Sequence, residues 1–191
     1  MASTPTSNLL CDSKNSCLVI IDIQERLSAA IPEKVMSRLR KNTSILLNAA
    51  NELSIPIIAT AQYPKGLGQI ETFVTDNLPD SSVQLEKTCF SCLGADGFDT
   101  QLKKLNKKQI LLIGIESHIC VLQSAFELVA EEYEVFVITD AVASRKLSSY
   151  EVALTRLNQG GVHLITTESV LFEWLRDASH SNFKTLSKTI L

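Results

Sequence analysis

The sequence predicts an α/β protein in which helices cover both faces of a parallel sheet. Runs of consecutive apolar residues recur along the chain, as is typical of parallel strands that are buried on both faces. Segments with apolar residues at helical spacing lie between these runs. Several runs end in a charged residue, and open parallel sheets bind ligands at the carboxyl ends of their strands. The chain has 191 residues, enough for one domain with a sizeable core, and we expect a single domain over residues 1–191.

Six segments have the apolar composition expected of strands. The first is apolar throughout and ends in an acid, whereas the third alternates between apolar and polar residues and ends in a lysine. The six predicted strands are Cys17–Asp22, Ile55–Ala61, Val83–Lys87, Gln109–Ile115, Val135–Asp140 and Val162–Thr166.

Helices are expected between most of these strands. Pro32 is suited to the first turn of a helix, and Gly160 with Gly161 is a typical helix stop. Strands that alternate with helices favour parallel crossover connections. We expect residues 1–16 to form a loose leader and residues 179–191 a polar tail. The predicted helices are Pro32–Leu53, Phe98–Leu105, Ile119–Tyr133, Tyr150–Asn158 and Ser169–Ala178.

The composition is that of an ordinary globular protein, with 45% apolar residues, 20% charged residues and a net charge of −3. Without a basic tract, neither nucleic acid nor an anionic membrane surface is an expected partner. No apolar run approaches the roughly 18 residues of a membrane span, and no secretory signal is evident. We therefore expect a cytoplasmic protein. Its five cysteines, an odd number, are expected to be reduced thiols.

Three reactive side chains fall at or just beyond strand ends: Asp22, Lys87 and Cys120. Taken singly, each has an ordinary interpretation, namely a loop cap, a surface charge and a small buried apolar residue. Their joint position favours a catalytic set. The aspartate would accept the thiol proton and later return it to the leaving group. The lysine would stabilise the charged partners, and the dipole of the helix near Cys120 would favour thiolate.

Four segments of the chain resemble the isochorismatase-like superfamily of cysteine hydrolases. The resemblance covers roughly residues 16–178 in order, and the Gln62–Gly68 loop is most similar to the isochorismatase domain-containing branch. The segments are Leu18–Gln24, Lys87 with Phe90 and Ser91, Gly114–Val121, and Asp140–Arg145.

The resemblance implies a three-layer α/β/α sandwich around a six-stranded parallel sheet in the order 3-2-1-4-5-6. It also implies a catalytic triad of Asp22, Lys87 and Cys120. A cis peptide bond between Ile115 and Glu116 is expected to aim the Glu116 and Cys120 N–H groups as an oxyanion hole. A homo-oligomer, a dimer or larger, is also expected, with the last helix and the tail as one possible interface.

Two differences from better-known members of this superfamily limit the reactions that we expect of this chain. Isochorismatase itself cleaves a vinyl ether and lacks the cysteine, so Cys120 favours acyl chemistry. Nicotinamidases bind a metal through an Asp-x-His segment, where this chain has Thr60-Ala61-Gln62 and no histidine between residues 23 and 117. We therefore expect no metal or other cofactor, and a hydrolase that cleaves a C–N (amide-type) bond of a small molecule through a Cys120 thioester. The alternative is a catalytically silent oligomeric scaffold or interaction protein with the same fold.

Several side chains near these strand ends are candidates for substrate contact. For His118, a plain turn residue is an equally good interpretation. The candidates are Gln24, Gln62, Tyr63, Leu67, His118 and Ile119.

Other polar residues in these segments are expected to have structural roles. Asp140 is expected to cap the loop that follows it, and the Glu116 side chain is expected to face solvent or a neighbouring subunit. Cys89 and Cys92 form a lone CxxC pair. They are interpreted as incidental small apolar residues, because a zinc site needs a second pair or histidines. The third interpretation of the protein's function is a redox switch, in which one of them forms a disulfide bond with Cys120.

Overall fold

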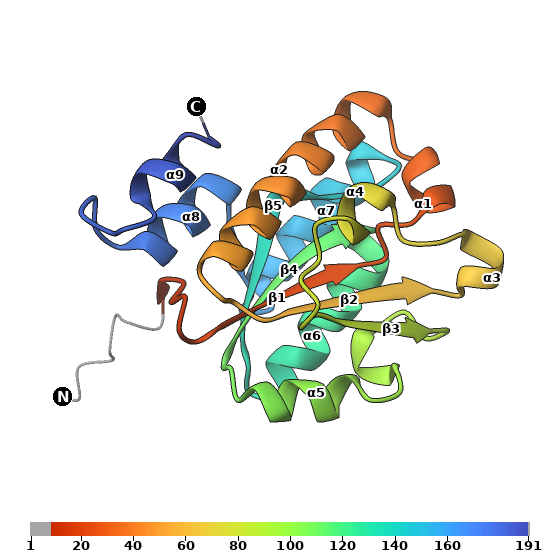
Figure 1. Cartoon of the computed structure of the whole chain (residues 1–191). Coiled ribbons are helices and arrows are strands. Elements are labelled where there is room, and N and C mark those ends of the chain that lie inside the picture. Colours follow the sequence, from red (N-terminus) through yellow and green to blue (C-terminus); the bar gives the residue numbers. More distant parts are fainter. Residues whose placement is uncertain (1–8, 191) are drawn as a thin grey trace.

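The computed structural model describes residues 9–190, which form a six-stranded, all-parallel sheet between two layers of helices (Figure 1). The strand order is β3-β2-β1-β4-β5-β6, which confirms the predicted fold class. The strands are β1 (Ser16–Ile21), β2 (Ile57–Gln62), β3 (Val83–Lys87), β4 (Gln109–Ile115), β5 (Glu134–Ala143) and β6 (His163–Ile165).

The main helices lie close to their predicted positions, and short ones fill the connections. A 3₁₀ turn, η2 (Cys92–Gly94), follows β3, and a π-helical turn, η3 (Ser117–Val121), follows β4. The segment that follows β1 begins a short helix at Glu25. The helices are α1 (Glu25–Ala29), α2 (Glu33–Glu52), α3 (Pro64–Leu67), α4 (Thr72–Thr75), α5 (Phe98–Leu105), α6 (Leu122–Ala130), α7 (Leu147–Gln159), α8 (Thr167–Leu175) and α9 (Phe183–Ser187).

The sheet divides the interior into two apolar cores. In β1, Leu18 and Ile20 point into the core shared with α2 and α8, whereas Val19 and Ile21 point into the core shared with α5, α6 and α7. Figure 1 shows α2 on one side of the sheet and α5 and α6 on the other. A strand buried on both faces needs apolar residues at odd and even positions alike, which explains its unbroken apolar run.

Strand β5 is longer than predicted, and this changes the role of Asp140. The strand continues to Ala143 because a shift in register between Leu112 and Gly114 lets it pair along the end of β4. Asp140 therefore lies inside the strand. Its carboxylate accepts hydrogen bonds from the Thr167 N–H (2.9 Å) and hydroxyl (2.8 Å) at the start of α8. The expectation that Asp140 caps the following loop is wrong.

Both ends of the described chain are better packed than predicted. Residues 1–8 of the expected leader lie outside the described residues, but Cys11 is fully buried and its N–H donates to Glu173 at 2.7 Å. The Asp12 N–H donates to the Gln109 side chain at 2.6 Å. In the expected tail, α9 buries Leu186 completely. Cys11 and Leu186 belong to the core that α2 and α8 share, so these segments are not loose.

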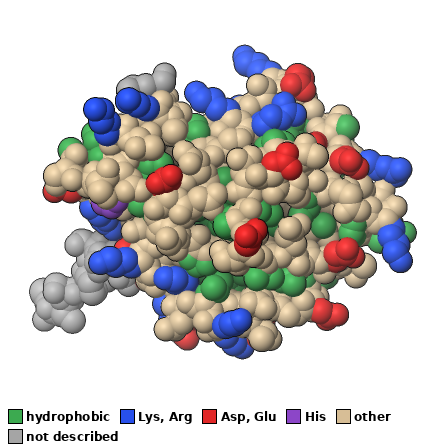
Figure 2. Space-filling model, in the orientation of Figure 1, with side chains coloured by type: hydrophobic (Ala, Val, Ile, Leu, Met, Phe, Trp, Pro, Cys, Tyr) green, Lys and Arg blue, Asp and Glu red, His purple; other side chains and the backbone are tan. Residues whose placement is uncertain are grey.

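The described surface carries charges of both signs. On the face shown in Figure 2, Lys and Arg side chains are interspersed with Asp and Glu, and neither sign forms a continuous patch. No helix within residues 9–190 is long and apolar enough to cross a membrane.

Candidate active site

The structure brings the predicted acid and amine together at the carboxyl end of the sheet. Asp22 directly follows β1, which lies between β2 and β4, and Lys87 ends the outer strand β3. Lys87 Nζ lies 2.6 Å from Asp22 Oδ2, and both side chains are 0% exposed. Asp22 has a left-handed φ of 51°, a conformation that Asp tolerates better than most residues and that turns the chain out of the sheet. A charged pair without any solvent contact occupies the centre of the site.

The Lys87 ammonium is surrounded by oxygen acceptors. Besides Asp22, Nζ donates to Gln62 Oε1 at 2.6 Å and approaches the carbonyl oxygens of Phe90 (3.1 Å) and Cys89 (3.3 Å). Burial, the largest single effect, disfavours the charged form, but the charge of Asp22, the hydrogen bond to it and the nearby Cys120 together outweigh burial, and the pKa of Lys87 is raised above its ordinary value. Lys87 therefore stays an ammonium and can stabilise charge but cannot accept a proton.

Cys120 lies in the η3 turn, and its thiol faces the same carboxylate. The side chain is 6% exposed. Burial raises the pKa of Cys120, and the charge of Asp22 and a hydrogen bond to it raise the pKa further, although the Lys87 charge opposes them. The prediction that the helix start would favour thiolate is therefore wrong. A helix dipole contributes about 1 kcal/mol or less, which is small beside burial next to an anion.

The second oxygen of Asp22 is bound by Thr60, which sequence reasoning missed. Thr60 Oγ1 donates to Asp22 Oδ1 at 2.8 Å, and the Thr60 carbonyl accepts from the Asp22 N–H at 3.1 Å. Thr60 is 1% exposed. Its one sequence signal is a hydroxyl in the otherwise apolar run Ile57–Ala61. The Asp22 carboxylate is thus bound by one side chain from β2 and one from β3.

The turn between β4 and Cys120 contains the main-chain N–H groups expected to form an oxyanion hole. The Ile115–Glu116 peptide bond is cis, the isomer implied by the resemblance. The Glu116 carbonyl accepts from Ile119 (3.1 Å) and Val121 (3.3 Å), not from Cys120. Among the described residues, no backbone oxygen accepts the Glu116 N–H. Glu116 N–H, one of the two groups expected to form an oxyanion hole, is thus not taken up by these contacts.

Two features of this segment depend on neighbouring strands. Gly114 has φ of 122°, and a Cβ there would lie 2.0 Å from the Ile21 carbonyl oxygen, so only glycine fits beside β1. The Glu116 carboxylate is 5% exposed and binds the Arg145 N–H (3.0 Å) and Nε (2.9 Å). The expectation that Glu116 faces solvent or another subunit is wrong, because the long β5 brings Arg145 beside it.

Gln24 and Gln62, both expected to contact substrate, are buried and bound to each other. Gln24 Oε1 accepts from the Gln62 N–H at 2.7 Å, and Gln24 Nε2 donates to the carbonyls of Gln62 (3.0 Å) and Gly68 (2.8 Å). The side-chain amide of Gln24 thus pairs with the main chain at the end of β2, in the way that a neighbouring strand would. Gln62 touches Lys87, whereas Gln24 anchors the 63–68 loop.

The other four candidates lie at the rim of the site or beside it. Tyr63 is 54% exposed and lines a cavity of about 430 Å³ with Lys87 and Thr88, and Leu67 is half-buried. His118 Nδ1 lies 2.9 Å from Ser144 Oγ, beside a separate cavity of about 220 Å³. Ile119 is half-buried against the core between the sheet and α6.

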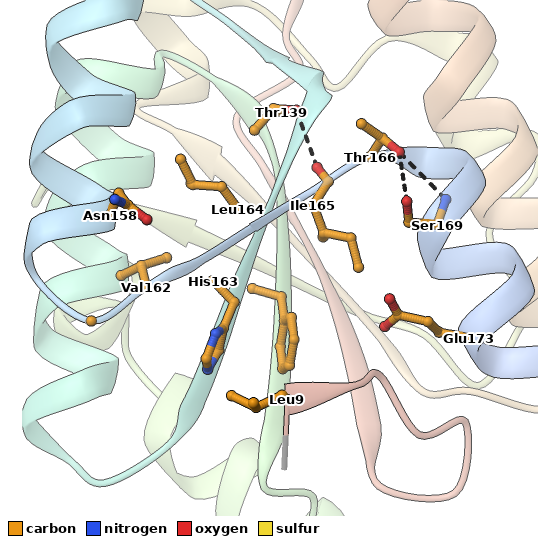
Figure 3. Close-up of a pocket in the computed structure, with 12 residues that line it drawn as sticks. Leu9, Thr139, Asn158, Val162, His163, Leu164, Ile165, Thr166, Ser169 and Glu173 are labelled. Carbon is orange, nitrogen blue, oxygen red and sulfur yellow. Dashed lines mark hydrogen bonds between the residues drawn. The ribbon is translucent and has the colours of Figure 1, made fainter. Parts of the chain in front are cut away.

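A larger cavity lies away from these residues. It has a volume of about 770 Å³ and runs along the open edge of β6, where Figure 3 shows Leu9, His163 and Glu173 among its walls. None of the three candidate catalytic side chains lines it. Within the described residues, no group of three His, Cys, Asp or Glu side chains is arranged to hold a metal ion, and all five cysteines are free.

The sheet order and the two helix layers define an α/β/α sandwich with its polar residues at the carboxyl ends of the central strands. Residues 16–169 match the isochorismatase domain, and the chain belongs to the isochorismatase family. It is 36% identical to isochorismatase family protein 1B of Dictyostelium discoideum, over 91% of this chain and 84% of that protein. Its identity to isochorismatase domain-containing protein 2 of Danio rerio is also 36%, over 93% of this chain and 88% of that protein.

Solved structures agree with this assignment. The MAR1 ribonuclease from Caenorhabditis elegans superimposes with a TM-score of 0.89 and 32% identity, covering 95% of this chain and 92% of that one. The YcaC protein of Escherichia coli, an octameric hydrolase of unknown specificity, has a TM-score of 0.88 and 23% identity, covering 98% and 92%. This chain thus has the hydrolase fold of the isochorismatase family.

Proposed function

We propose that this protein is a cysteine hydrolase that cleaves a C–N (amide-type) bond of a small molecule through a thioester on Cys120. The observation that carries the proposal is the fully buried Lys87–Asp22 pair, 2.6 Å apart, beside the Cys120 thiol. Removing two charges from water costs several kcal/mol per ion unless their geometry compensates. A carboxylate paired with a cation next to a buried thiol is suited to general-base catalysis.

Asp22 moves the proton in each half of the proposed reaction. It takes the thiol proton as Cys120 Sγ attacks the substrate carbonyl carbon, and a C–S bond forms. When the C–N bond breaks, Asp22 gives this proton to the departing nitrogen, so that ammonia or an amine leaves. Water then attacks the thioester and gives a proton to Asp22, which returns it to sulfur as the acid product leaves. Cys120 and Asp22 end as they began.

The remaining groups act on charge and position. Lys87 keeps its proton throughout, and it stabilises Asp22 and the negative charge that develops on sulfur. The Glu116 and Cys120 N–H groups are proposed to bind the oxyanion, which requires main-chain donors that are free of internal acceptors. Glu116 N–H meets this requirement among the described backbone contacts. Tyr63 and Leu67 are proposed to border the substrate.

A silent scaffold with this fold is the second candidate. The E. coli neighbour is described as an octamer, and we propose a homo-oligomer for this chain as well. Nothing in a purely structural role requires an acid, an amine and a thiol to be buried together. The enzyme is therefore the better-supported proposal.

A small molecule is the proposed substrate, although a neighbour at 32% identity is described as a ribonuclease. The net charge of −3 and the interspersed charges in Figure 2 do not offer the basic surface that nucleic-acid phosphates require.

A screen of small amides, carbamates and ureas for release of ammonia or amine tests the proposal. Cys120→Ala is the control, because it removes the nucleophile and little else. We expect turnover of at least one compound by the wild type and none by Cys120→Ala. Full activity of the variant would overturn the mechanism. A wild type that turns over nothing and whose Cys120 resists acylation would favour the scaffold.

A further inference from the structure

Thr60 is the one described side chain besides Lys87 and Cys120 that forms a hydrogen bond with the Asp22 carboxylate. Thr60 binds both the main chain and the side chain of Asp22. Its carbonyl accepts from the Asp22 N–H (3.1 Å), and its hydroxyl donates to Oδ1 (2.8 Å). Lys87 binds the other oxygen, Oδ2. The carboxylate plane is therefore fixed by one partner on each oxygen.

The hydrogen atoms in this group of residues have only one consistent arrangement. A carboxylate can only accept, so the single hydroxyl proton of Thr60 goes to Asp22. Cys92 Sγ lies 3.9 Å from Thr60 Oγ1, and with that proton committed, the Cys92 thiol must be the donor. Burial raises the pKa of Cys92 to about 12, and the charge of Asp22 also raises it. Cys92 therefore keeps the proton that it donates.

Cys92 is also connected to the main chain of the nucleophile. Its N–H donates to Ser124 Oγ at 2.9 Å, and Ser124 Oγ donates to the Cys120 carbonyl at 2.7 Å. A continuous chain of contacts thus runs from the Cys120 main chain through Ser124, Cys92 and Thr60 to Asp22. Cys92 is buried in the apolar core, as expected of a small apolar residue, but its N–H and its thiol also have buried polar partners.

We propose that Thr60 is a positioning residue that orients the Asp22 carboxylate toward the Cys120 thiol, with Cys92 holding the Thr60 hydroxyl in place. The inference rests on the proposed function, in which Asp22 is the base. Without the hydroxyl, Oδ1 loses its fixed partner, and Lys87 on Oδ2 is left to hold the carboxylate. The carboxyl group can then turn about its last side-chain torsion, which is intrinsically soft.

The test is acylation of Cys120 by 4-nitrophenyl acetate near neutral pH, followed by release of nitrophenolate and by mass spectrometry of the Cys120 peptide. Thr60→Val keeps the shape but removes the hydroxyl, and Thr60→Ser restores it. Thr43→Val is the matched control, because Thr43 is fully buried and its hydroxyl has no hydrogen-bond partner among the described residues. Thr60→Ala replaces Thr60→Val if the latter does not fold.

We expect Thr60→Val to lower the maximal acylation rate about tenfold or more, since small errors in the position of a catalytic group have effects of this size. The reagent concentration at half-saturation should not change. Thr60→Ser and Thr43→Val should react like the wild type. Cys92→Ala should show a smaller decrease in the same rate.

The Asp22→Asn background separates the two proposals. If Thr60 acts through Asp22, adding Thr60→Val to Asp22→Asn slows acylation no further. An equal slowing in both backgrounds, or a wild-type rate for Thr60→Val, would overturn the role of Thr60 and leave the proposed function intact. If Asp22→Asn is itself acylated as fast as the wild type, the proposed function fails.

Discussion

At the scale of single residues, the state of each ionisable group is decided by burial and by its nearest charge. Cys120 is a thiol at rest because it is buried beside an anion. Lys87 is an ammonium although burial opposes its charge, because the neighbouring Asp22 carboxylate stabilises the cation. The protonation states of Cys120 and Lys87 therefore both depend on the Asp22 carboxylate.

The first residue-scale prediction concerns the buried ion pair. Lys87→Met keeps the length of the side chain but leaves the Asp22 carboxylate buried without its cation. We expect the free energy of unfolding to fall by about 3–5 kcal/mol, measured by urea denaturation.

The matched variant is Lys87→Met combined with Asp22→Asn, in which neither charge of this pair remains. This double variant should recover much of the lost stability while staying inactive. Equal stability of the single and double variants would show that the charge of Asp22 is not the cause.

The second residue-scale prediction is a loss of stability at alkaline pH. Burial raises the pKa of the Cys17 thiol in β1 from the ordinary value of 9.0 to about 12. Because the folded pKa is the higher one, the thiol stabilises the fold fully below about pH 9, and this stability is lost as the pH rises toward 12. One such group contributes at most about 1.4 kcal/mol per pH unit in this window.

Cys17→Ala should therefore make the free energy of unfolding less steeply dependent on pH above about pH 9. The measurement is a series of urea denaturation curves for both proteins. Parallel curves would mean that Cys17 ionises alike in the folded and unfolded chains.

At the scale of secondary-structure elements, the site depends on how closely β1 and β4 approach each other. Their register pairs Ile21 with Gly114, directly before Asp22 on one strand and before the Glu116 turn on the other. The extended end of β5 then places Arg145 against Glu116. The turn that carries Cys120 is thus positioned by three adjacent strands.

Gly114→Ala tests this close approach. The new Cβ would lie 2.0 Å from the Ile21 carbonyl oxygen, and alanine is also strained at a φ of 122°. We expect a loss of about 3 kcal/mol or more in stability, from overpacking and backbone strain together. Acylation of Cys120 should be lost in whatever protein still folds.

Gly97→Ala is the control, since Gly97 also has a positive φ (86°) but no atom lies within 4 Å of the added Cβ. It should lose only about 1–2 kcal/mol from the backbone conformation. Thermal unfolding of both variants measures the difference. Equal losses would show that the contact with β1 is unimportant.

At the scale of the whole molecule, the described surface leaves large apolar side chains on helix α7. Leu147 is 70% and Val152 is 59% exposed. Exposed apolar groups of this size are frequent in protein interfaces. They provide a concrete place for the association proposed above.

We expect the protein to sediment at a multiple of its monomer mass, and Leu147→Glu to weaken this association, measured by analytical ultracentrifugation. Leu9→Glu is the matched control, because Leu9 is 60% exposed but lies beside β6 (Figure 3). A monomeric wild type, or equal weakening by both variants, would rule out α7 as the interface.

Much of the fold and part of the site could be predicted from the sequence, because they depend on local patterns. A strand buried on both faces must be apolar at every position, so β1 and β4 are visible as unbroken runs. Helical spacing identified α2 and α5 almost to their ends. Their positions at strand ends identified Asp22, Lys87 and Cys120 as a candidate catalytic set, and the resemblance supplied the strand order.

Contacts between distant segments were decided only by the tertiary structure. Thr60 binds a carboxylate 38 residues away, and Cys92 donates to Thr60 across 32 residues. No local pattern encodes such pairs, because they depend on strand register and on which groups lose contact with water. For the same reason, the sequence identified Cys120 as a candidate nucleophile, whereas its burial against Asp22 decided that it rests as a thiol.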